Sequence, residues 1–440
     1  MEDMEAVDAG ETEKKQRFDF RSFGESQSSN DDGFFTFSST EQKRVEELVR
    51  SKRRAFDLDP ETTAPVLARD AHIHYLLSCL KSLPAGFGDL DASRPWLLYW
   101  IVHSLRLLSV PISLELEEKA IAVLQACQCH DGGYGGGPSQ SAHLAPTYAA
   151  VMALCEIGTE AAYKSIRRPQ LYHFLCRMKQ KSGAFRMHAD GEEDVRGSYC
   201  ALAAASITHT LSPRLVEGAA EWIISCQTYE GGFGGFPDCE AHGGYTFCGL
   251  AALVLLGRTS LVDGDALEKW LAFKQMAFEG GFQGRTNKLV DGCYSYWVAA
   301  CFPLLRMCLQ AAEAKSDEEA NWLFDNRALQ EYVLVCCQDE ERGGLLDKPD
   351  KRSDPYHTCY CLSGLSIAQH FYEGRSDVVG PRETNELLPT HPVFNISMES
   401  ERRARAHFES LSTIVDKWWG DSFDGQSVAP PAVARRKSNE

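Results

Sequence analysis

One aspartate, one cysteine and one histidine are the residues of this 440-residue chain best suited to hold a metal ion. Asp291 and Cys293 flank Gly292, which lets the chain bend so that both side chains converge. His357 lies 64 residues after Cys293. A carboxylate, a thiolate and an imidazole suit Zn²⁺, and three protein ligands leave a fourth position open, as a catalytic zinc requires. The alternative is a capping aspartate, a buried cysteine and a surface histidine.

A repeated unit of about 50 residues decides whether these three residues can meet. Each unit has a helix with charged residues, a glycine loop, and a second helix that is apolar nearly all round. The first helix ends on a glutamine in each of five copies: Gln128, Gln180, Gln227, Gln275 and Gln338. Helices that are apolar all round must be buried on both sides, so we expect them inside a ring of charged helices. The pattern predicts an all-α fold, an α/α barrel (toroid) of two concentric helix rings, and disfavours an open solenoid.

Polar residues fall at equivalent positions just before each inner helix. The helices are aligned here on the aromatic residues Tyr148, Tyr199, Phe247, Tyr296 and Tyr360. Five residues earlier are His143, Asp194, His242, Asp291 and Pro355. Three residues earlier are Ala145, Arg196, Gly244, Cys293 and His357. Equivalent positions lie on one rim of a barrel, so Cys293 and His357 are expected to meet.

A second group of residues is expected to bind an anion. Arg285 and Lys288 precede the inner helix that begins near Tyr294, and His242 begins the inner helix before it. Helix N-termini already favour anions through their N–H groups and dipole. Cationic side chains and a phenol added there fit a diphosphate better than a single carboxylate. The alternative is a solvated loop.

Aromatic residues at the starts of the inner helices are expected to line a hydrocarbon channel, although plain core packing is the alternative. They are Trp96, Tyr99, Trp100, Tyr199, Tyr245, Phe247, Tyr296 and Trp297. A channel with zinc and an anion pocket at its mouth predicts transfer of an isoprenyl group from a diphosphate to a thiol. Zinc would hold that thiol as the nucleophilic thiolate, and the cations would stabilise the departing diphosphate.

Three long motifs carry a family resemblance: EAHGGYTFCGLAAL, FEGGFQGRTNKLVDGCYSYW and LLDKPDKRSDPYHTCYCLSGLSIAQHF. From about Ser93 to Asn395 the chain resembles the β subunits of protein prenyltransferases, and among them protein farnesyltransferase. The resemblance implies an α/α barrel, one catalytic Zn²⁺, and farnesyl diphosphate as donor. It also implies proteins with a C-terminal CaaX motif, such as small GTPases, as acceptors, and an obligate heterodimer with a separate α subunit.

The same resemblance implies roles for individual residues. The zinc ligands would be Asp291, Cys293 and His357, with Tyr294 also catalytic. The diphosphate site would be His242, Arg285, Lys288 and Tyr294. The isoprenoid would contact Trp96, Arg196, Tyr199, Gly244, Tyr245, Cys248 and Trp297. The peptide would contact Trp100, His143, Ala145, Pro146, Tyr356 and Tyr360. Asp347 matches a position linked to the Mg²⁺ that assists diphosphate departure.

Trp96 bears on the length of the isoprenoid. The resemblance implies a tryptophan at this position in farnesyl enzymes and a smaller residue in type I geranylgeranyltransferase β subunits. Those β subunits are the alternative to a farnesyl enzyme. Tyr360 also fits the farnesyl pattern. A terpene cyclase would need a DxDD or DDxxD motif, and the sequence has neither. A non-catalytic helical-toroid binding module would give the Asp, Cys and His no purpose, and zinc stoichiometry would separate it.

Composition limits the remaining possibilities. A net charge of −17 argues against a general nucleic-acid surface. The sequence has no stretch of 18 or more apolar residues, so it predicts no membrane-spanning helix. Sixteen cysteines scattered through apolar runs indicate reduced thiols of a cytoplasmic protein. We expect a disordered acidic and Ser-rich extension at 1–40, the catalytic barrel at 41–400, and a C-terminal helix and disordered tail at 401–440.

Overall fold

The structure, a computed structural model, describes residues 35–59, 64–81, 90–312, 322–372 and 375–412. These residues form helices and one antiparallel strand pair, β1 (His370–Tyr372) with β2 (Arg375–Ser376). The first helices are α1 (Phe37–Leu58), α2 (Arg69–Lys81), α3 (Arg94–Leu107), α4 (Leu114–Cys127), α5 (Leu144–Ile157), α6 (Glu160–Ser165), α7 (Arg168–Met178), α8 (Val195–Ile207), α9 (Pro213–Val216) and α10 (Ala219–Ile224). The remaining helices are α11 (Gly243–Leu256), η2 (Thr259–Leu261), α12 (Gly264–Ala272), α13 (Tyr294–Trp297), α14 (Cys301–Ala312), α15 (Asn326–Cys336), α16 (Pro355–Gln369), α17 (Arg382–Asn385) and α18 (Met398–Glu409).

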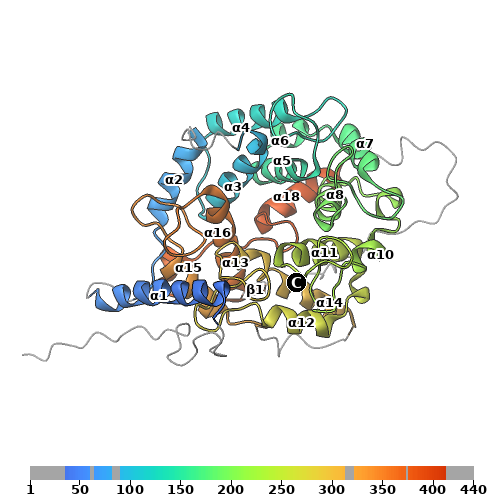
Figure 1. Cartoon of the computed structure of the whole chain (residues 1–440). Coiled ribbons are helices and arrows are strands. Elements are labelled where there is room, and N and C mark those ends of the chain that lie inside the picture. Colours follow the sequence, from blue (N-terminus) through green and yellow to red (C-terminus); the bar gives the residue numbers. More distant parts are fainter. Residues whose placement is uncertain (1–34, 60–63, 82–89, 313–321, 373–374, 413–440) are drawn as a thin grey trace, which may run out of the picture.

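The helices form two concentric rings (Figure 1). Each inner helix contacts the next in the order α3, α5, α8, α11, α13, α16, and α16 contacts α3, so the ring closes. Helices α2, α4, α7, α10, α12 and α15 lie outside it. Inner α5 buries 13 of its 14 residues, whereas outer α12 buries three of nine, as the charge pattern predicts. The predicted α/α barrel is confirmed, and closure excludes an open solenoid.

The inner helix that begins near Tyr294 was expected to be one continuous apolar helix, and this is wrong. Helix α13 ends at Trp297 and α14 begins at Cys301. Between them, the Cys301 N–H donates to the Val298 carbonyl and the Phe302 N–H to the Ala299 carbonyl. Hydrogen bonds three residues apart tighten the backbone and interrupt the α-helical ladder. The short α13 therefore ends one turn after the rim.

The chain ends differ in detail from the predicted domain boundaries. Helix α1 begins at Phe37, inside the segment 1–40 that we predicted to be disordered. Helix α18 begins at Met398, just before the predicted C-terminal segment. Residues 1–34 and 413–440 lie outside the described residues, so those predictions stand as made. No helix in the described part of the chain is both long and apolar enough to cross a membrane.

The repeated glutamines join each glycine loop to the next outer helix. Gln227 Nε2 donates to the carbonyl of Asp263, which caps α12, and Gln227 Oε1 accepts from the same residue's N–H, both at 3.1 Å. Gln275 makes the same pair with Asp325, the cap of α15. Gln338 Oε1 accepts from Ala68 N–H (2.8 Å), just before α2. The last repeat is thus hydrogen-bonded to the first.

In the second repeat the predicted glutamine, Gln180, is wrong by one residue. Lys179 pairs with Phe185 as Gln227 does with Phe233 in the third repeat. Lys179 Nζ donates to the carbonyl four residues later, at 2.7 Å, as Gln227 Nε2 does at 2.9 Å. A lysine therefore takes the glutamine's position because both side chains can donate to the carbonyl of the turn.

A segment from near the chain's end fills the middle of the ring; we call residues Pro392–Asn395 the plug. Tyrosine hydroxyls from four inner helices donate to four plug carbonyls: Tyr99 to Asn395 (2.6 Å), Tyr148 to Phe394 (2.8 Å), Tyr199 to Val393 (2.8 Å) and Tyr296 to Pro392 (3.1 Å). None of these tyrosines is more than 2% exposed. Unpaired buried polar groups are costly, so the tyrosines and the plug satisfy one another.

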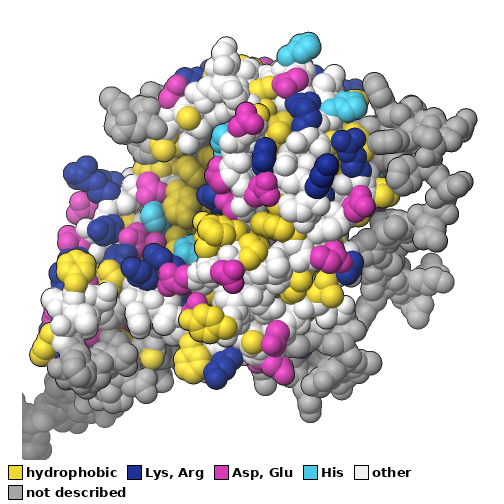
Figure 2. Space-filling view, turned by 45° about the vertical axis from the view of Figure 1, so that its right-hand side comes forward, with side chains coloured by type: hydrophobic (Ala, Val, Ile, Leu, Met, Phe, Trp, Pro, Cys, Tyr) yellow, Lys and Arg dark blue, Asp and Glu magenta, His cyan; other side chains and the backbone are white. Residues whose placement is uncertain are grey.

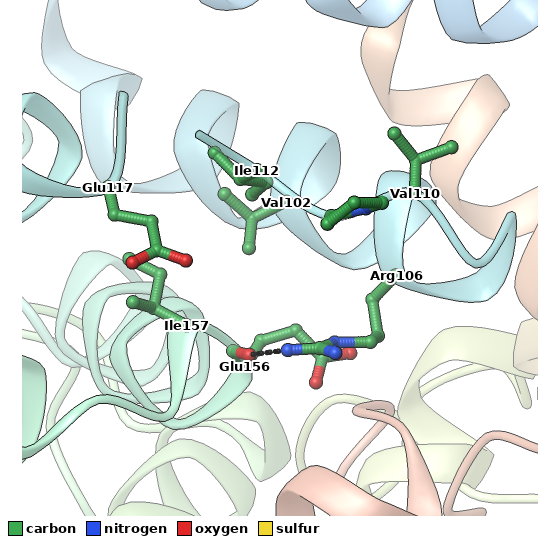
Figure 3. Close-up of a pocket in the computed structure, with 8 residues that line it drawn as sticks. Val102, Arg106, Val110, Ile112, Glu117, Glu156 and Ile157 are labelled. Atoms are coloured by element: carbon green, nitrogen blue, oxygen red, sulfur yellow. Dashed lines mark hydrogen bonds between the residues drawn. The ribbon is translucent and has the colours of Figure 1, made fainter. Parts of the chain in front are cut away.

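Below the plug, the inner helices meet in a buried polar network. His103 Nδ1 lies 2.6 Å from Glu156 Oε1, which also accepts from the Ser397 N–H (2.9 Å). Burial would raise the pKa of Glu156, but the hydrogen bond and charge of His103 lower it. Arg106 donates to the Glu156 carbonyl across a pocket of about 120 Å³ (Figure 3). Ligand sites commonly have volumes of about 300–1,000 Å³. This pocket is smaller, and we interpret it as a gap in the packing between α3 and α5.

Candidate active site

The inner helices begin at one rim, and at the start of several of them a polar side chain accepts a hydrogen bond from a backbone N–H. His143 Nδ1 accepts from the Ala145 N–H (3.1 Å) and His242 Nδ1 from the Gly244 N–H (3.0 Å). Asp291 Oδ1 accepts from the N–H of Cys293 (2.9 Å). Capping satisfies helix N–H groups and so accounts for polar residues at this position. For Asp291, the capping role that was the alternative to metal binding is therefore present together with the convergence described below.

The alignment of the last inner helix is wrong by one residue. Asp354, and not Pro355, caps α16, because Asp354 Oδ1 accepts from the His357 N–H (2.8 Å). The Asp354 N–H donates to the carbonyl of Leu345 in its glycine loop. The N–H groups of His143, His242 and Asp291 donate to the equivalent carbonyls of their own glycine loops. His357 is therefore the third residue after its capping aspartate, Asp354, whereas Cys293 is the second residue after Asp291. The aromatic used for alignment, Tyr360, misled because the aromatic position shifts in this repeat.

The three predicted metal ligands nevertheless converge. The ligand atoms of Asp291, Cys293 and His357 all lie within 4.8 Å of one another. Asp291 Oδ1 is 3.4 Å from His357 Nε2. The one-residue offset is accommodated because α13 and α16 are in direct contact. The prediction that these side chains meet is confirmed, and the donor set fits a zinc ion with an open position.

Asp354, which the sequence analysis missed, orients the histidine of this group. Its Oδ2 lies 2.6 Å from His357 Nδ1, so the other ring nitrogen, Nε2, faces the metal-binding group. Burial alone would lower the pKa of His357, but hydrogen bonds and charges of Asp291 and Asp354 raise it to about 10. Burial and the Asp291 charge raise the pKa of Cys293. Ser-Asp-Pro at 353–355, a helix-capping pattern, was the signal available in the sequence.

Asp347 lies beside the metal-binding group. Its backbone carbonyl accepts from the N–H of Gly292 (2.6 Å) and from the hydroxyl of Tyr332 (3.2 Å). Its carboxylate contacts the ammonium of Lys348, which is 7% exposed and was also missed. Burial and the charge of Asp291 raise the pKa of Asp347. A second carboxylate close to the metal ligands is thus already paired with a cation.

His242 was expected to add positive charge to the anion site, and this is wrong. Burial, and then the charge of Arg285, lower the pKa of His242 to about 4, so it is neutral at neutral pH. Because Nδ1 accepts from Gly244, the proton is on Nε2, which donates to the Tyr294 hydroxyl (3.0 Å). The Tyr294 O–H is then available to a ligand. His242 therefore orients a donor instead of supplying charge.

The two expected cations of the anion site lie on one loop at the rim. Arg285 Nη1 is 2.9 Å from Glu240 Oε2 and remains 40% exposed. Lys288 is exposed, and none of the ion pairs among the described residues includes it. Arg196, expected beside the isoprenoid, is 46% exposed, and Asp194 holds it through a hydrogen bond that raises the pKa of the guanidinium. Arg285 and Lys288 therefore present two cationic side chains on one loop at the rim.

Aromatic side chains form a continuous wall inside the rim. Trp96 stacks on Trp100 (5.6 Å between ring centres), and Trp100 meets Tyr356 edge-on (5.4 Å). Tyr356 accepts from Trp297 Nε1 (3.1 Å), and Trp297 contacts Tyr360 (4.4 Å). In the space-filling view, hydrophobic side chains form the floor of a recess with histidines at its edges (Figure 2). An aromatic surface is therefore present inside the rim, whereas four of the aromatic residues predicted to line a channel are at most 2% exposed: Tyr99, Tyr199, Phe247 and Tyr296.

The predicted contact residues divide into two groups by exposure. Those exposed or partly exposed at the rim or along the wall are Trp96, Trp100, His143, Ala145, Arg196, Gly244, Tyr245, Trp297 and Tyr356. Those at most 5% exposed are Tyr199, Cys248 and Tyr360, and Pro146 is also buried. Contacts with isoprenoid or peptide remain predictions for both groups, and neighbouring side chains already cover most of the surface of the buried group.

A closed double ring of helices with a metal-binding group at one rim defines a class of helical toroid proteins. The family described as "Prenyltransferase alpha-alpha toroid domain" matches residues 67–396. The protein geranylgeranyltransferase-I of Candida albicans complexed with GGPP has a similar structure, with a TM-score of 0.64 and 21% identity. The match covers 78% of this chain and 99% of that one, and it shows the fold.

Relatives narrow the class. The protein farnesyltransferase subunit beta of Pisum sativum is 43% identical over 417 residues, covering 80% of this chain and 98% of the relative. That of Arabidopsis thaliana is 40% identical, covering 85% and 90%. The geranylgeranyl transferase type-1 subunit beta of Arabidopsis thaliana is 29% identical, covering 68% and 85%. The chain belongs to the family of protein farnesyltransferase β subunits.

Proposed function

We propose that residues 41–400 form the catalytic domain of a protein farnesyltransferase β subunit. The domain would transfer farnesyl from farnesyl diphosphate to the cysteine thiol of a C-terminal CaaX motif. The observation that carries the proposal is that one rim of the barrel holds an Asp-Cys-His donor set, a loop with Arg285 and Lys288, and an aromatic wall. The greater identity to farnesyltransferase than to geranylgeranyltransferase type-1 β subunits supports farnesyl as the donor group.

Asp291, Cys293 and His357 are the proposed zinc ligands, since their ligand atoms converge within 4.8 Å. When bound there, Zn²⁺ would supply the positive charge that keeps an acceptor thiol ionised at neutral pH. Asp354 would hold the His357 ring so that Nε2 faces the metal. Cys293 and His357 must lose their protons to bind, so we expect zinc uptake to release protons.

The cationic rim is proposed to stabilise the departing diphosphate. Arg285 and Lys288 would pair with its oxygens, and the Tyr294 O–H, oriented by His242, would donate a hydrogen bond. Such donors act most strongly where they are fixed in advance. Asp347 is the proposed ligand for Mg²⁺, and Mg²⁺ would compete there with the ammonium of Lys348.

The aromatic wall is proposed to hold the farnesyl chain, and its end would be set by Trp96, which packs on Trp100 and Tyr148. The proposed isoprenoid contacts are Trp96, Arg196, Tyr199, Gly244, Tyr245, Cys248 and Trp297. The proposed peptide contacts are Trp100, His143, Ala145, Pro146, Tyr356 and Tyr360. We also propose an obligate heterodimer with an α subunit and a cytoplasmic location.

The test is transfer of labelled farnesyl to a CaaX peptide by the chain co-expressed with a candidate α subunit. We expect transfer to the peptide, loss of transfer on chelation, and no transfer to the same peptide with serine in place of cysteine. Labelled geranylgeranyl diphosphate in parallel measures donor preference. A folded heterodimer that transfers neither group to the cysteine peptide would contradict the proposal.

A further inference from the structure

A buried lysine lies under the loop that carries the two proposed diphosphate cations; we call residues 284–288 the cationic loop. Lys274 follows α12, and it is 2% exposed. Its Nζ donates to Thr286 Oγ1 in the cationic loop at 2.8 Å. The same Nζ lies 4.7 Å from the centre of the Trp270 ring. An ammonium group from the outer helix layer thus reaches the loop from beneath.

The charge of this lysine is incompletely compensated within the protein. None of the ion pairs formed by the described residues includes Lys274, and Glu230 and Glu240 act on it only at longer range. Both carboxylates have other partners, Arg285 for Glu240 (2.9 Å) and the Ala241 N–H for Glu230 (3.2 Å). Burying an ammonium group without a counter-charge is costly. Its retention beside an anion site therefore calls for a purpose.

The end of α12 holds the cationic loop at further points. The Gln283 N–H donates to the Lys274 carbonyl (2.9 Å), and Gln283 Nε2 donates to the Phe273 carbonyl (3.3 Å). Gln283 Oε1 accepts from the N–H of Lys288 (3.1 Å). Gln283 thus fixes the end of the loop that carries Lys288, and Lys274 fixes its middle.

We propose that Lys274 is a positioning residue for diphosphate binding, an inference that rests on the proposed function. It holds the cationic loop through Thr286 and adds positive potential beneath it, without touching the diphosphate. It therefore strengthens binding of the diphosphate group and does not affect binding of the hydrocarbon or the peptide. The geometry assigns this role to the outer helix layer, where the sequence analysis placed no functional residue.

The test measures dissociation constants of inorganic diphosphate and farnesyl diphosphate for the heterodimer with Lys274→Met or Thr286→Val. We expect Lys274→Met to weaken both ligands by the same factor, about threefold to tenfold, because the loop loses one hydrogen bond and the site loses one nearby positive charge. The peptide KM should be unchanged, and Lys274→Arg should recover most of the loss. The double variant should bind little worse than Lys274→Met alone, because the two residues act as one contact.

The matched control is Lys179→Met. Lys179 also lies over an aromatic ring (Phe185, 4.6 Å) and donates to a loop carbonyl, but in the second repeat. We expect this variant to lose stability and to keep its affinity for inorganic diphosphate. Equal weakening by the control would overturn the inference, as would a folded Lys274→Met protein that binds inorganic diphosphate like the wild type.

A second variant keeps the test decisive if Lys274→Met does not fold. Thr286 is exposed, so Thr286→Val tests the same contact without disturbing the core. Unchanged affinity for inorganic diphosphate in Thr286→Val would then overturn the inference. Farnesyl transfer by the wild-type heterodimer, measured on the same preparation, tests the proposed function separately. Transfer with unchanged affinities would sink the Lys274 inference alone, and absent transfer would sink the proposed function.

Discussion

The rim and the plug are built from the same inner helices, yet their polar side chains behave differently. On α13, the Tyr294 hydroxyl at the rim is hydrogen-bonded to His242, and Tyr294 remains partly exposed. Tyr296, two residues later, is fully buried and donates to the plug carbonyl of Pro392. The four plug carbonyls are satisfied by buried tyrosine hydroxyls, whereas polar groups at the rim are held in place and left to meet a ligand. Changes at the rim should therefore remove function, and changes at the plug should remove stability.

The largest effect is expected from Cys293→Ala. Loss of one of three protein ligands should lower zinc affinity by more than the about 10–100-fold caused by losing a supporting residue. We expect transfer to fall to background while farnesyl diphosphate still binds, measured by metal content and by a binding assay. Cys301→Ala, at a buried cysteine near the start of α14, is the control and should keep its zinc. Equal loss of zinc and diphosphate binding in folded Cys293→Ala would contradict the division of roles at the rim.

Trp96→Thr tests the aromatic wall, where rim and core meet. The space it opens should admit a further isoprene unit, because Trp96 packs against Trp100 and Tyr148. Five added carbons at about 0.8 kcal/mol each would change the geranylgeranyl-to-farnesyl preference by up to about a thousandfold. The ratio of kcat/KM for the two donors measures this. An unchanged ratio would show that Trp96 does not set the length of the channel.

Asp354→Asn tests whether holding the His357 ring in place matters for zinc binding, because it leaves all three proposed ligands intact. Asparagine still caps α16 but offers no carboxylate to His357 Nδ1. We expect zinc affinity to fall by about 10–100-fold with little change in thermal stability. Competition with a chelator of known affinity measures the first, and unfolding of the metal-free protein the second. Wild-type zinc affinity in this variant would mean that the hydrogen bond does not support the metal-binding group.

Tyr294→Phe and Tyr296→Phe form a matched pair on one helix. At the rim, loss of the Tyr294 donor should lower transfer at least about tenfold with little effect on stability. At the plug, loss of the Tyr296 hydroxyl should lower the free energy of unfolding by about 1 kcal/mol and leave transfer unchanged. Transfer kinetics at low temperature measure the loss of activity, and thermal unfolding measures the loss of stability. The comparison between rim and plug fails if the two variants lose the same property.

The smallest effect concerns His242 and pH. Its pKa is about 4 in the folded protein and about 6.5 in an unfolded chain, so the unfolded chain binds more protons between these values. Stability should therefore fall as the pH drops from about 6.5 to about 4. His242→Gln should remove part of this slope, at most about 1.4 kcal/mol per pH unit. His130→Gln, at an exposed histidine, is the control and should keep the wild-type slope.

Much of this architecture could be predicted from hydrophobicity and repetition. Alternation of charged and wholly apolar helices is enough to place one set inside the other, and α5 and α12 show this contrast. Asp291 and Cys293 were found because three adjacent residues carry two metal-binding side chains. His357 was found although its alignment was wrong by one residue, because direct contact of α13 with α16 tolerates that error.

What could not be predicted depends on contacts between distant segments. The plug appears as an ordinary loop in the sequence, because its partners are tyrosines up to about 300 residues away. The neutral state of His242 follows from burial and from Arg285, neither of which the sequence reveals. Lys274 lies in an outer repeat position with no motif of its own. Such features follow from the assembled ring and not from any one segment.

The most direct test of the central claim is metal content, by elemental analysis, of the chain purified as a heterodimer with its α subunit. We predict one zinc ion per heterodimer, lost on chelation together with farnesyl transfer and restored by added zinc. An assembled, folded heterodimer that transfers farnesyl with no zinc bound would contradict the role assigned to Asp291, Cys293 and His357.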